Sequence, residues 1–394
     1  MSMIMMMAAM LAAEEPAQAI NDQTLTLAQD NAAFAFDLYA QINTQEGNLF
    51  CSPYSISTAL AMAYGGARGE TARQMAQVVR FTLPHEKLHA AFSELDTYFE
   101  SLNDGQNIAL HAANSLWLDQ SLVVLDAYRA LTQKYYGANL FQVDYLKQTE
   151  AARKQINGWV AEQTNKKIEE LLKQGDIDAQ TVAALVNAIY FKGKWLNPFD
   201  EKLTKDVPFW LSKDKPINVP TMHQTGTFEY GETDDWQMLA LPYAGEKILM
   251  VIVLPKAKDG LSNLEKQLTY EHVSNWLQRT SPQRVKVSLP KFTIRYRIAL
   301  QEILNALGLT ALSDFSGISE QAMELSKVIH EAFVDVNEQG TEAAAATAVA
   351  MGRGMPRPPA EFQADHPFVF FMIDMTTGSF LFVGRVTNPA EGAK

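Results

Sequence analysis

Hydrophobic residues recur at helical spacing in the early part of the chain. Leu88, Phe92, Leu95 and Phe99 are three or four residues apart, so a helix over Glu86–Leu102 would carry them on one face. The same spacing predicts further helices at Asn31–Gln41, Ile56–Tyr64, Thr71–Val79 and Ala151–Lys173. Helices are therefore expected to predominate before about residue 181.

From about residue 181 the pattern changes to that of strands. Ile248–Leu254 is continuously apolar, which indicates burial on both faces, whereas Val285, Val287 and Leu289 alternate as in a half-exposed strand. Other strands are predicted at Val182–Phe191, Ser326–Val336, Phe368–Ile373 and Phe380–Val386. Helices followed by strands, without a fixed repeat, indicate one α+β domain rather than a βαβ array.

The segment after Val336 combines several unusual features. Asn337–Gly340 is a polar stop that ends in a glycine, which can change its backbone angles freely. In Thr341–Ala350, a period of two places no charged residue on the face that begins with Thr341, so this strand could lie between two others without burying an ion. On composition alone, the alanine run favours a plain helix or a small-residue linker.

Glycines and prolines follow the alanine run. Met351–Met355 contains two glycines around Arg353, and Pro356, Pro358 and Pro359 come next. Proline resists both helix and central strand. The sequence therefore predicts an accessible loop with a basic residue at its tip.

Composition limits the functional classes. The chain has 394 residues, of which 47% are hydrophobic, so it can bury a large core, and its net charge of −12 argues against a nucleic-acid surface. The single cysteine, Cys51, excludes an intramolecular disulfide and is expected to be a small buried hydrophobe.

Catalytic and metal-binding patterns are missing from the sequence. His85 and His89 are four residues apart and could share a metal, but no third ligand and no HExxH pattern accompany them. No nucleophile–base pairing and no phosphate-binding glycine loop occur. We therefore predict neither an enzyme nor a metal or cofactor site.

The N-terminal segment resembles an export signal. Met3–Ala13 is an apolar run, and Ala17–Ala19 has the A-x-A form of a cleavage site, although no basic residue precedes the run. No run reaches the length of a membrane span. Residues 1–23 are thus expected to be signal-like or disordered, and the protein to be secreted or periplasmic.

Several ordered motifs are similar to those of one known family. Val328–Ala345 resembles the strand-to-hinge signature of inhibitory serpins. Further motifs agree in the family's order: Asn48–Ile56, Asn187–Trp195, Leu289–Phe292, Phe362–Phe368 and Phe382–Pro389. The resemblance implies the serpin fold, with helices packed around three β-sheets in a single domain over residues 24–390 and an exposed reactive-centre loop at about 340–359. Low cysteine and the methionine-rich start suggest a bacterial member.

The resemblance also implies a function. A target serine protease would cut the loop and form a covalent acyl complex, and the loop would then insert into the central sheet and trap the protease. We expect a monomer without cofactor, membrane or nucleic-acid partners. The alternatives are a carrier, chaperone or storage protein on the same scaffold, or a cysteine-protease inhibitor, although the hinge has none of the bulky residues or prolines that non-inhibitory members often carry.

The family motifs assign roles to individual residues. Ser52, Ser55, Asn187 and His330 match the shutter, the polar cluster over which the strands part, and Trp195 and Lys291 match the breach, where insertion begins. Family spacing places the cut bond near Gly354, and a loop one residue shorter gives Arg353–Gly354, which would suit a trypsin-like protease. The residues that match the hinge are Glu338, Gly340, Thr341, Ala343, Ala344, Ala345, Ala346 and Thr347.

Overall fold

The computed structural model describes residues 20–137, 139–341 and 358–392. Helices dominate its first part, as expected. Their bounds are α2 (Asp22–Ile42), α3 (Pro53–Tyr64), α4 (Gly69–Val78), α5 (His85–Ser101), α6 (Asp126–Tyr135), α7 (Tyr145–Gln163), α8 (Leu261–Glu265), α9 (Tyr270–Leu277) and α10 (Gln301–Ala306).

The smaller of two hydrogen-bonded sheets has the strand order β10-β11-β4-β2-β3. Its strands are β10 (Phe292–Ala299), β11 (Lys327–Val336), β4 (Ala183–Lys194), β2 (Ile108–Asp119) and β3 (Leu140–Val143). A two-residue strand, β12 (Gly340–Thr341), pairs with β4 outside this path.

The larger sheet has the order β1-β15-β14-β8-β7-β6-β9-β13, with β5 beside β6. Its strands are β1 (Leu49–Cys51), β5 (Lys205–Ser212), β6 (Lys215–Glu232), β7 (Trp236–Pro242), β8 (Ile248–Pro255), β9 (Ser281–Pro290), β13 (Ala360–Gln363), β14 (Phe368–Asp374) and β15 (Phe380–Val386). Strand β6 pairs with β5 near its start and with β7 near its end. The long strand β6 therefore belongs to two of the three expected sheets and joins them into one hydrogen-bonded sheet.

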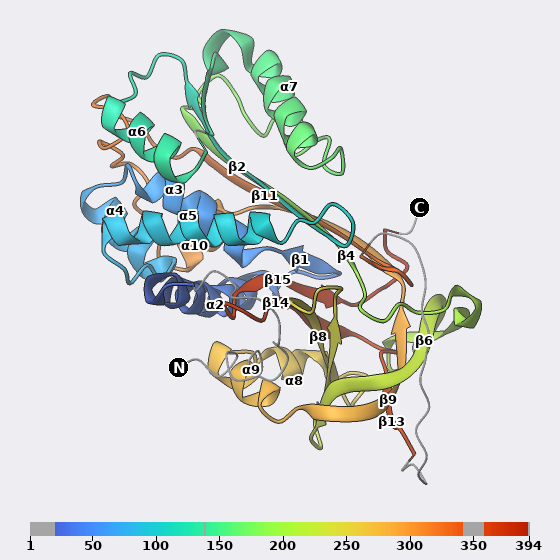
Figure 1. Cartoon of the computed structure of the whole chain (residues 1–394). Coiled ribbons are helices and arrows are strands. Elements are labelled where there is room, and N and C mark those ends of the chain that lie inside the picture. The colour runs from blue at the N-terminus through green and yellow to red at the C-terminus, as the bar shows by residue number, and fades with distance from the viewer. Residues whose placement is uncertain (1–19, 138, 342–357, 393–394) are drawn as a thin grey trace.

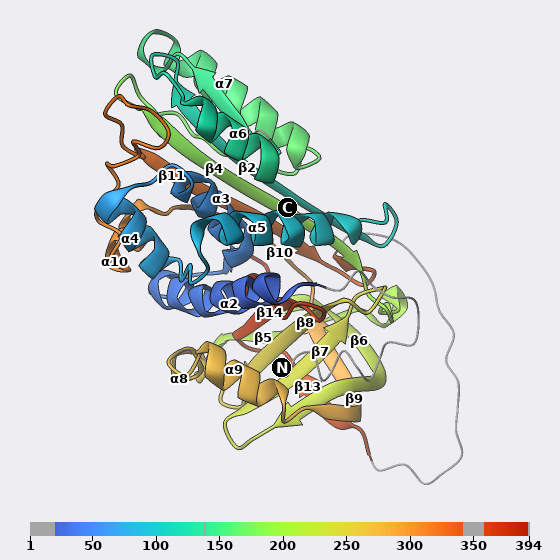
Figure 2. The same cartoon turned by 60° about the vertical axis from the view of Figure 1, so that its left-hand side comes forward.

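The layers follow from which faces are apolar. Figure 1 shows α7 on one face of the smaller sheet, with α2, α3 and α5 on the opposite side. The main core fills the space between those helices and the two sheets, and a second core lies between α7 and the smaller sheet. Figure 2 shows the same division after a turn of 60°. The predicted α+β class is confirmed.

Local chemistry fixes the helix starts. The side chain of Asn21 accepts hydrogen bonds from the backbone N–H groups of Gln23 and Thr24 at the start of α2. Helix α3 begins after Ser52, whose hydroxyl accepts from the backbone N–H of Ser55, and Pro53 occupies the first helical position. No helix in the described ranges is long and apolar enough to cross a membrane.

One predicted helix is too long. The helix expected over Ala151–Lys173 ends at Gln163, because Asn165 and Lys166 adopt positive φ angles of 50° and 60°. Ile168 and Leu171 still pack beneath α7, but from an irregular segment, residues 164–177, that runs back across the sheet. Their burial produced the misleading helical pattern.

Several strands were not predicted. Strand β2 lies within the part of the chain expected to be helical, and its sequence alternates poorly because both of its faces are covered. Strand β6 contains Pro216, Pro220 and Gly226, which are residues that usually argue against a strand. The predicted strands β8 and β9 have the expected burial, with β8 buried throughout and β9 alternating at Val285, Val287 and Leu289.

Candidate functional site

The smaller sheet is open at one end, between two parallel strands. Strands β11 and β4 pair from Lys327 opposite Ala184 to Phe333 opposite Tyr190. Beyond that point β11 pairs only with β10, and β4 pairs instead with β12, which brings Thr341 opposite Gly193. The segment that leads into the predicted loop therefore begins as an antiparallel strand inside this opening.

A buried polar cluster lies lower on the same seam. His330 on β11 is opposite Asn187 on β4, which is itself opposite Asn114 on β2. The side-chain nitrogen of Asn187 donates to the backbone oxygen of Ser55 at 3.0 Å and to its hydroxyl at 2.5 Å, and it also contacts the amide oxygen of Asn114. The backbone N–H of Ser52 donates to Nε2 of His330 at 3.2 Å.

The hydrogen bonds of the cluster define the protonation of His330. A backbone N–H can only donate, so Nε2 of His330 carries a lone pair and the ring proton resides on Nδ1. Nδ1 then donates to the amide oxygen of Asn187, which leaves the amide nitrogen of Asn187 to donate onward. Complete burial lowers the pKa of His330 to about 3, so the ring is neutral at pH 7.

A second polar cluster surrounds the opening itself. The indole N–H of Trp195 donates to the backbone oxygen of Asn337 at 3.0 Å, and its ring stacks on Tyr243 with centroids 4.5 Å apart. The hydroxyl of Tyr243 is 3.0 Å from that of Thr341. The last turn before the loop is thus held to β4 by an aromatic pair.

Glu338 is fixed by an ion pair across this turn. Nζ of Lys291 is 2.8 Å from Oε2 of Glu338, and the hydroxyl of Thr204 donates to Oε1 at 2.8 Å. Burial alone would raise the pKa of Glu338, but the hydrogen bonds from Lys291 and Thr204 outweigh it, so the pKa is lowered. The carboxylate is therefore ionised in the folded protein at neutral pH.

Gly340 occupies a position that only glycine can take. Its φ is +138°, and a Cβ there would lie 2.1 Å from the backbone oxygen of Gly193. Asn337 and Gly340 exchange backbone hydrogen bonds of 2.8 and 3.1 Å, which closes a tight turn. Gly340, for which the sequence predicts a hinge, is therefore required here for the close approach of two backbones.

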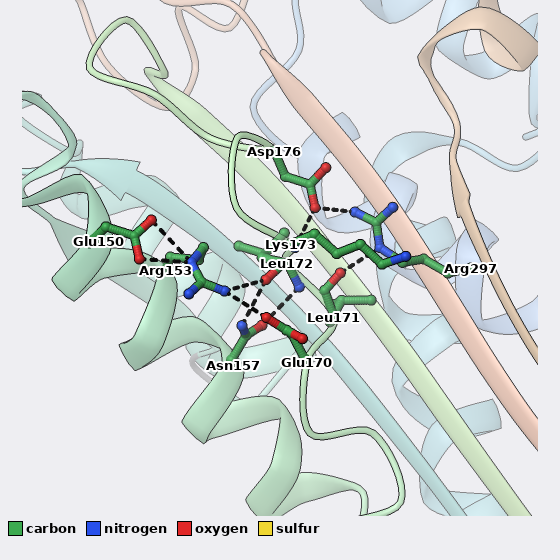
Figure 3. A network of polar contacts seen from close by, with 9 residues as sticks. All are labelled: Glu150, Arg153, Asn157, Glu170, Leu171, Leu172, Lys173, Asp176 and Arg297. Atoms are coloured by element: carbon green, nitrogen blue, oxygen red, sulfur yellow. Dashed lines mark hydrogen bonds and ion pairs between the residues drawn. The ribbon is translucent and has the colours of Figure 1, made fainter.

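The 164–177 segment covers the seam between β4 and β11. Figure 3 shows Arg153 and Asn157 of α7 reaching into this segment from one side and Arg297 of β10 from the other. Nη1 of Arg153 donates to the backbone oxygen of Leu172 at 2.9 Å, and Nε of Arg297 donates to that of Leu171 at 2.5 Å. Arg297 also forms an ion pair with Asp176. The segment must be displaced if another strand enters the seam.

The structure brings together the predicted residues that it describes. Ser52, Ser55, Asn187 and His330 form one cluster, and Trp195, Lys291, Glu338, Gly340 and Thr341 form the other. The remaining predictions lie outside the described residues: Ala343, Ala344, Ala345, Ala346, Thr347, Arg353 and Gly354.

Three contributors to these clusters were not predicted. Asn114 was missed because β2 was missed, although an asparagine amid apolar residues could have marked it. Tyr243 and Thr204 come from distant segments, and no sequence pattern near either residue indicates its partner.

The histidine pair considered for a metal is occupied by other contacts. Nε2 of His85 is 3.4 Å from Nε2 of His89, and Nδ1 of His89 is 2.5 Å from the hydroxyl of Tyr136. The described residues contain no group of three or more potential ligands.

Comparisons with known proteins agree on one family. The family model described as "Serpin (serine protease inhibitor)" matches residues 29–389. Leukocyte elastase inhibitor of Bos taurus is 42% identical, and serpin B6 of Macaca fascicularis is 41% identical, each match covering 92% of this chain and 99% of the relative. Among solved structures, maspin has a TM-score of 0.87 at 31% identity over 94% of this chain and 100% of its own. Uncleaved ovalbumin has a TM-score of 0.83 at 28% identity over 92% and 100%.

These relatives correct two expectations. The prediction of a secreted or periplasmic protein is wrong, because serpin B6 and leukocyte elastase inhibitor are intracellular members that lack signal peptides. The suggested bacterial origin is not supported either, since these relatives are mammalian. The apolar start and the A-x-A triplet are short, common patterns, and the basic residues that give such a signal its specificity are missing.

The open seam, the polar clusters and the matches over nine-tenths of the chain lead to one conclusion: this chain belongs to the serpin family, and it is a protease inhibitor rather than an enzyme.

Proposed function

We propose that this chain, as a monomer with one domain over residues 24–390, traps trypsin-like serine proteases by cleavage and insertion of its reactive-centre loop. The protease serine attacks the carbonyl carbon of Arg353, the bond to Gly354 breaks, and the Gly354 nitrogen leaves as an amine. The protease then stays attached to Arg353 through an ester. Insertion of the loop before this ester is hydrolysed distorts the attached protease.

The observation that carries the proposal is the register of β12. Gly340 is opposite Lys194 and Thr341 is opposite Gly193, in an antiparallel ladder at the mouth of the seam. Continued in the same register, Ala343 would face Phe191 and Ala345 would face Ile189, both of which belong to the main core. Opposed residues share a face, so the uncharged face of the loop is the one that would enter that core.

The same register explains why the other loop residues are small. Ala346 and Ala348 would lie opposite Ala188 and Val186, which belong to the second core beneath α7. A strand that is covered on both faces tolerates neither charge nor bulk. Insertion would also give the loop two ladders of hydrogen bonds that the native fold withholds, so the native state is kinetically stable.

The choice of cut bond rests on the chemistry of the loop. Arg353 suits an acidic specificity pocket, and Gly354 suits a small subsite on the leaving side. Arg357 is followed by Pro358, which is unfavourable for trypsin-like cleavage, and Met355 is followed by Pro356. We therefore assign Arg353–Gly354.

The test is incubation with trypsin, followed by a denaturing gel and mass spectrometry of the released C-terminal peptide. We expect a boiling-resistant band at the summed mass of both proteins and a peptide that begins at Gly354. Arg353→Gln should remove this band, whereas the matched control Arg357→Gln should retain it. Cleavage without a complex would instead indicate a carrier or storage protein, and a complex with papain alone would indicate a cysteine-protease inhibitor.

A second target class has one specific observation in its favour. Relatives at 41–42% identity are named leukocyte elastase inhibitors. An elastase prefers a small apolar residue before the cut, and Val349 and Ala350 provide such residues in the same loop. A complex with leukocyte elastase that survives Arg353→Gln would favour this target over trypsin-like proteases.

A further inference from the structure

A cavity outside the trap residues lies on the larger sheet, between strand β5 and the neighbouring face of β6 and β9. Its volume is about 530 Å³, which is within the range of small-molecule sites. The segment Gln363–Asp365, directly after β13, forms one wall. Figure 2 shows these strands in the lower half of the view, well away from α7 at the top.

The apolar walls of this cavity are held in place. Leu203, Val207, Phe209 and Trp210 contribute them. Nζ of Lys258 lies 3.5 Å from the centroid of the Trp210 ring, and the backbone N–H of Trp210 donates to the backbone oxygen of Asp365 at 2.7 Å. One contact therefore holds the ring and the other holds the backbone of β5 against the wall at Asp365.

The opposite side of the cavity carries positive charge. Lys205, Lys286 and His223 line it. Nδ1 of His223 is 2.9 Å from the hydroxyl of Ser288, and Nε2 is buried, with less than 1 Å² of exposed surface and no hydrogen-bond partner among the described residues. A ligand in the cavity therefore meets the two lysines rather than Nε2.

Of the two lysines near His223, only one has an acidic partner. Lys286 pairs with Glu361 at 3.3 Å, and Asp365 contacts Nδ1 of His366 at 2.6 Å, so both acids have partners. Lys205 forms no ion pair with any described residue. Burial, and then the charges of Lys205 and Lys286, lower the pKa of His223, which agrees with a positive potential at this wall.

We propose that this cavity binds a small organic anion with an apolar body, of the class of medium-chain or aromatic carboxylates. The carboxylate lies near the ammonium of Lys205, on the wall that His223 also lines. The body packs on Val207 and Trp210. A bound ligand would connect β5 and β6 to Gln363–Asp365, and thereby fix the strand that follows the reactive-centre loop.

The first experiment is a titration of the full-length protein with 1-anilinonaphthalene-8-sulfonate, whose aromatic body and sulfonate match both sides of the cavity. We expect the dye to bind at one saturable site. Dodecanoate should displace the dye and so reduce its fluorescence. The double variant Lys205→Gln/Lys286→Gln should bind at least tenfold more weakly, while the exposed control Lys266→Gln should bind like the wild type. Val207→Trp, which fills the cavity from its apolar side, should also abolish binding.

Hydrogen exchange with saturating dodecanoate locates the site independently of inhibitory activity. Amides in residues 205–210 and 360–365 should exchange more slowly, and those of α5 should not change. Three results would overturn the proposal: no saturable binding, binding that neither the double variant nor Val207→Trp weakens, or protection elsewhere. Occupation by a second copy of the chain would also contradict it, and this would appear as dimerisation in sedimentation at the titration concentrations.

Discussion

Gly340 combines a backbone conformation and a close contact that both require glycine. The φ of +138° disfavours any side chain, and a Cβ would meet the backbone oxygen of Gly193 at 2.1 Å. Gly245 also has a positive φ, of +85°, but a Cβ there would meet no atom of the described residues within 4 Å beyond its chain neighbours. A substitution at Gly245 therefore tests the backbone strain without the clash. The comparison of these two glycines isolates the steric contribution at the mouth of the seam.

We expect Gly340→Ala to lower the thermal midpoint more than Gly245→Ala does. The strained φ alone costs about 1–2 kcal/mol at either position, and the clash at Gly340 should add about as much again. Differential scanning calorimetry of both variants measures the difference. Equal shifts in the two variants would show that the turn at 337–340 relaxes without cost.

His330 makes the stability of the buried polar cluster around Asn187 depend on pH. Its folded pKa of about 3 is below the ordinary value of 6.5, so the unfolded chain binds a proton first as the pH falls. The contribution of His330 to stability is therefore complete above pH 6.5 and is lost progressively between 6.5 and 3. Glu331 acts in the opposite sense, because burial raises its pKa to about 6, and its contribution is lost as the pH rises through that value.

We predict that His330→Gln reduces the loss of urea resistance between pH 7.5 and pH 5. On the order of 2 kcal/mol of that loss should come from His330 alone, since each pH unit below 6.5 is worth about 1.4 kcal/mol. The exposed His272→Gln is the control and should leave the difference unchanged. The readout is the difference in urea resistance between pH 7.5 and pH 5, because the substitution also removes the hydrogen bonds of His330 and so lowers stability at both pH values. An unchanged pH difference in His330→Gln would contradict the neutral, buried ring.

The turn before the loop behaves as one element, held by the ion pair between Lys291 and Glu338. The side chain of Glu338 is 8% exposed and that of Lys291 is 38% exposed, so loss of the lysine leaves a largely buried carboxylate. Thr204 provides only one neutral donor to it. The cost of the unpaired charge should therefore exceed the value of the pair itself.

We expect Lys291→Met to destabilise the native fold by about 1–3 kcal/mol, and the double variant Lys291→Met/Glu338→Gln to recover part of that loss. Urea unfolding, monitored by tryptophan fluorescence, measures the loss in the single variant and the recovery in the double variant. A double variant that is less stable than the single variant would show that the carboxylate is stabilised by groups other than Lys291.

The loop is the element whose predicted behaviour depends on single side chains. In the register of β12, residue 345 would face Ile189 in the main core. We predict that Ala345→Arg converts the inhibitor into a substrate, because insertion would bury a charge and become slower than ester hydrolysis. Ala345→Ser, which is small and uncharged, should still form the complex. An unchanged yield of covalent complex in Ala345→Arg would contradict insertion at this register.

At the scale of the whole molecule, insertion should change stability more than any substitution. A loop of ~15 residues in a sheet spans about 50 Å and gains two ladders, while the existing ladder between β4 and β11 is lost. A net gain of about 10 hydrogen bonds at about 1 kcal/mol each would raise the thermal midpoint of a chain of this size by roughly 10 °C or more.

We therefore predict that protein nicked in the loop by a metalloprotease, which forms no acyl intermediate and so is not trapped, melts at least about 10 °C higher than intact protein. Calorimetry before and after nicking measures this, and mass spectrometry confirms that the loop bond is the only one cut. The Ala345→Arg variant should gain less on nicking. An equal or lower midpoint after nicking of the wild type would mean that the loop does not enter the sheet.

The sequence predicted the elements whose own residues carry a clear apolar pattern, whether on one face, as in α5, or on both, as in β8. Helix α5 and strands β8, β11, β14 and β15 agree with their predicted ranges to within one residue at each end. Strand β2 and the 164–177 segment were missed, because both are buried by neighbours distant in sequence. The sequence named residues that lie together in the two polar clusters, such as His330 and Lys291, but it did not name Asn114 or Tyr243, whose contacts arise only from pairing across the sheet.

The sequence by itself determined the family, the absence of a disulfide and the loop with an uncharged face, because these depend on residue type and order. Only the tertiary structure decided that β4 and β11 part beyond Phe333, that β12 already lies in the opening, and that the 164–177 segment covers the seam. These are contacts between segments up to about 170 residues apart, such as Lys167 and Phe333, and local patterns cannot encode such pairings.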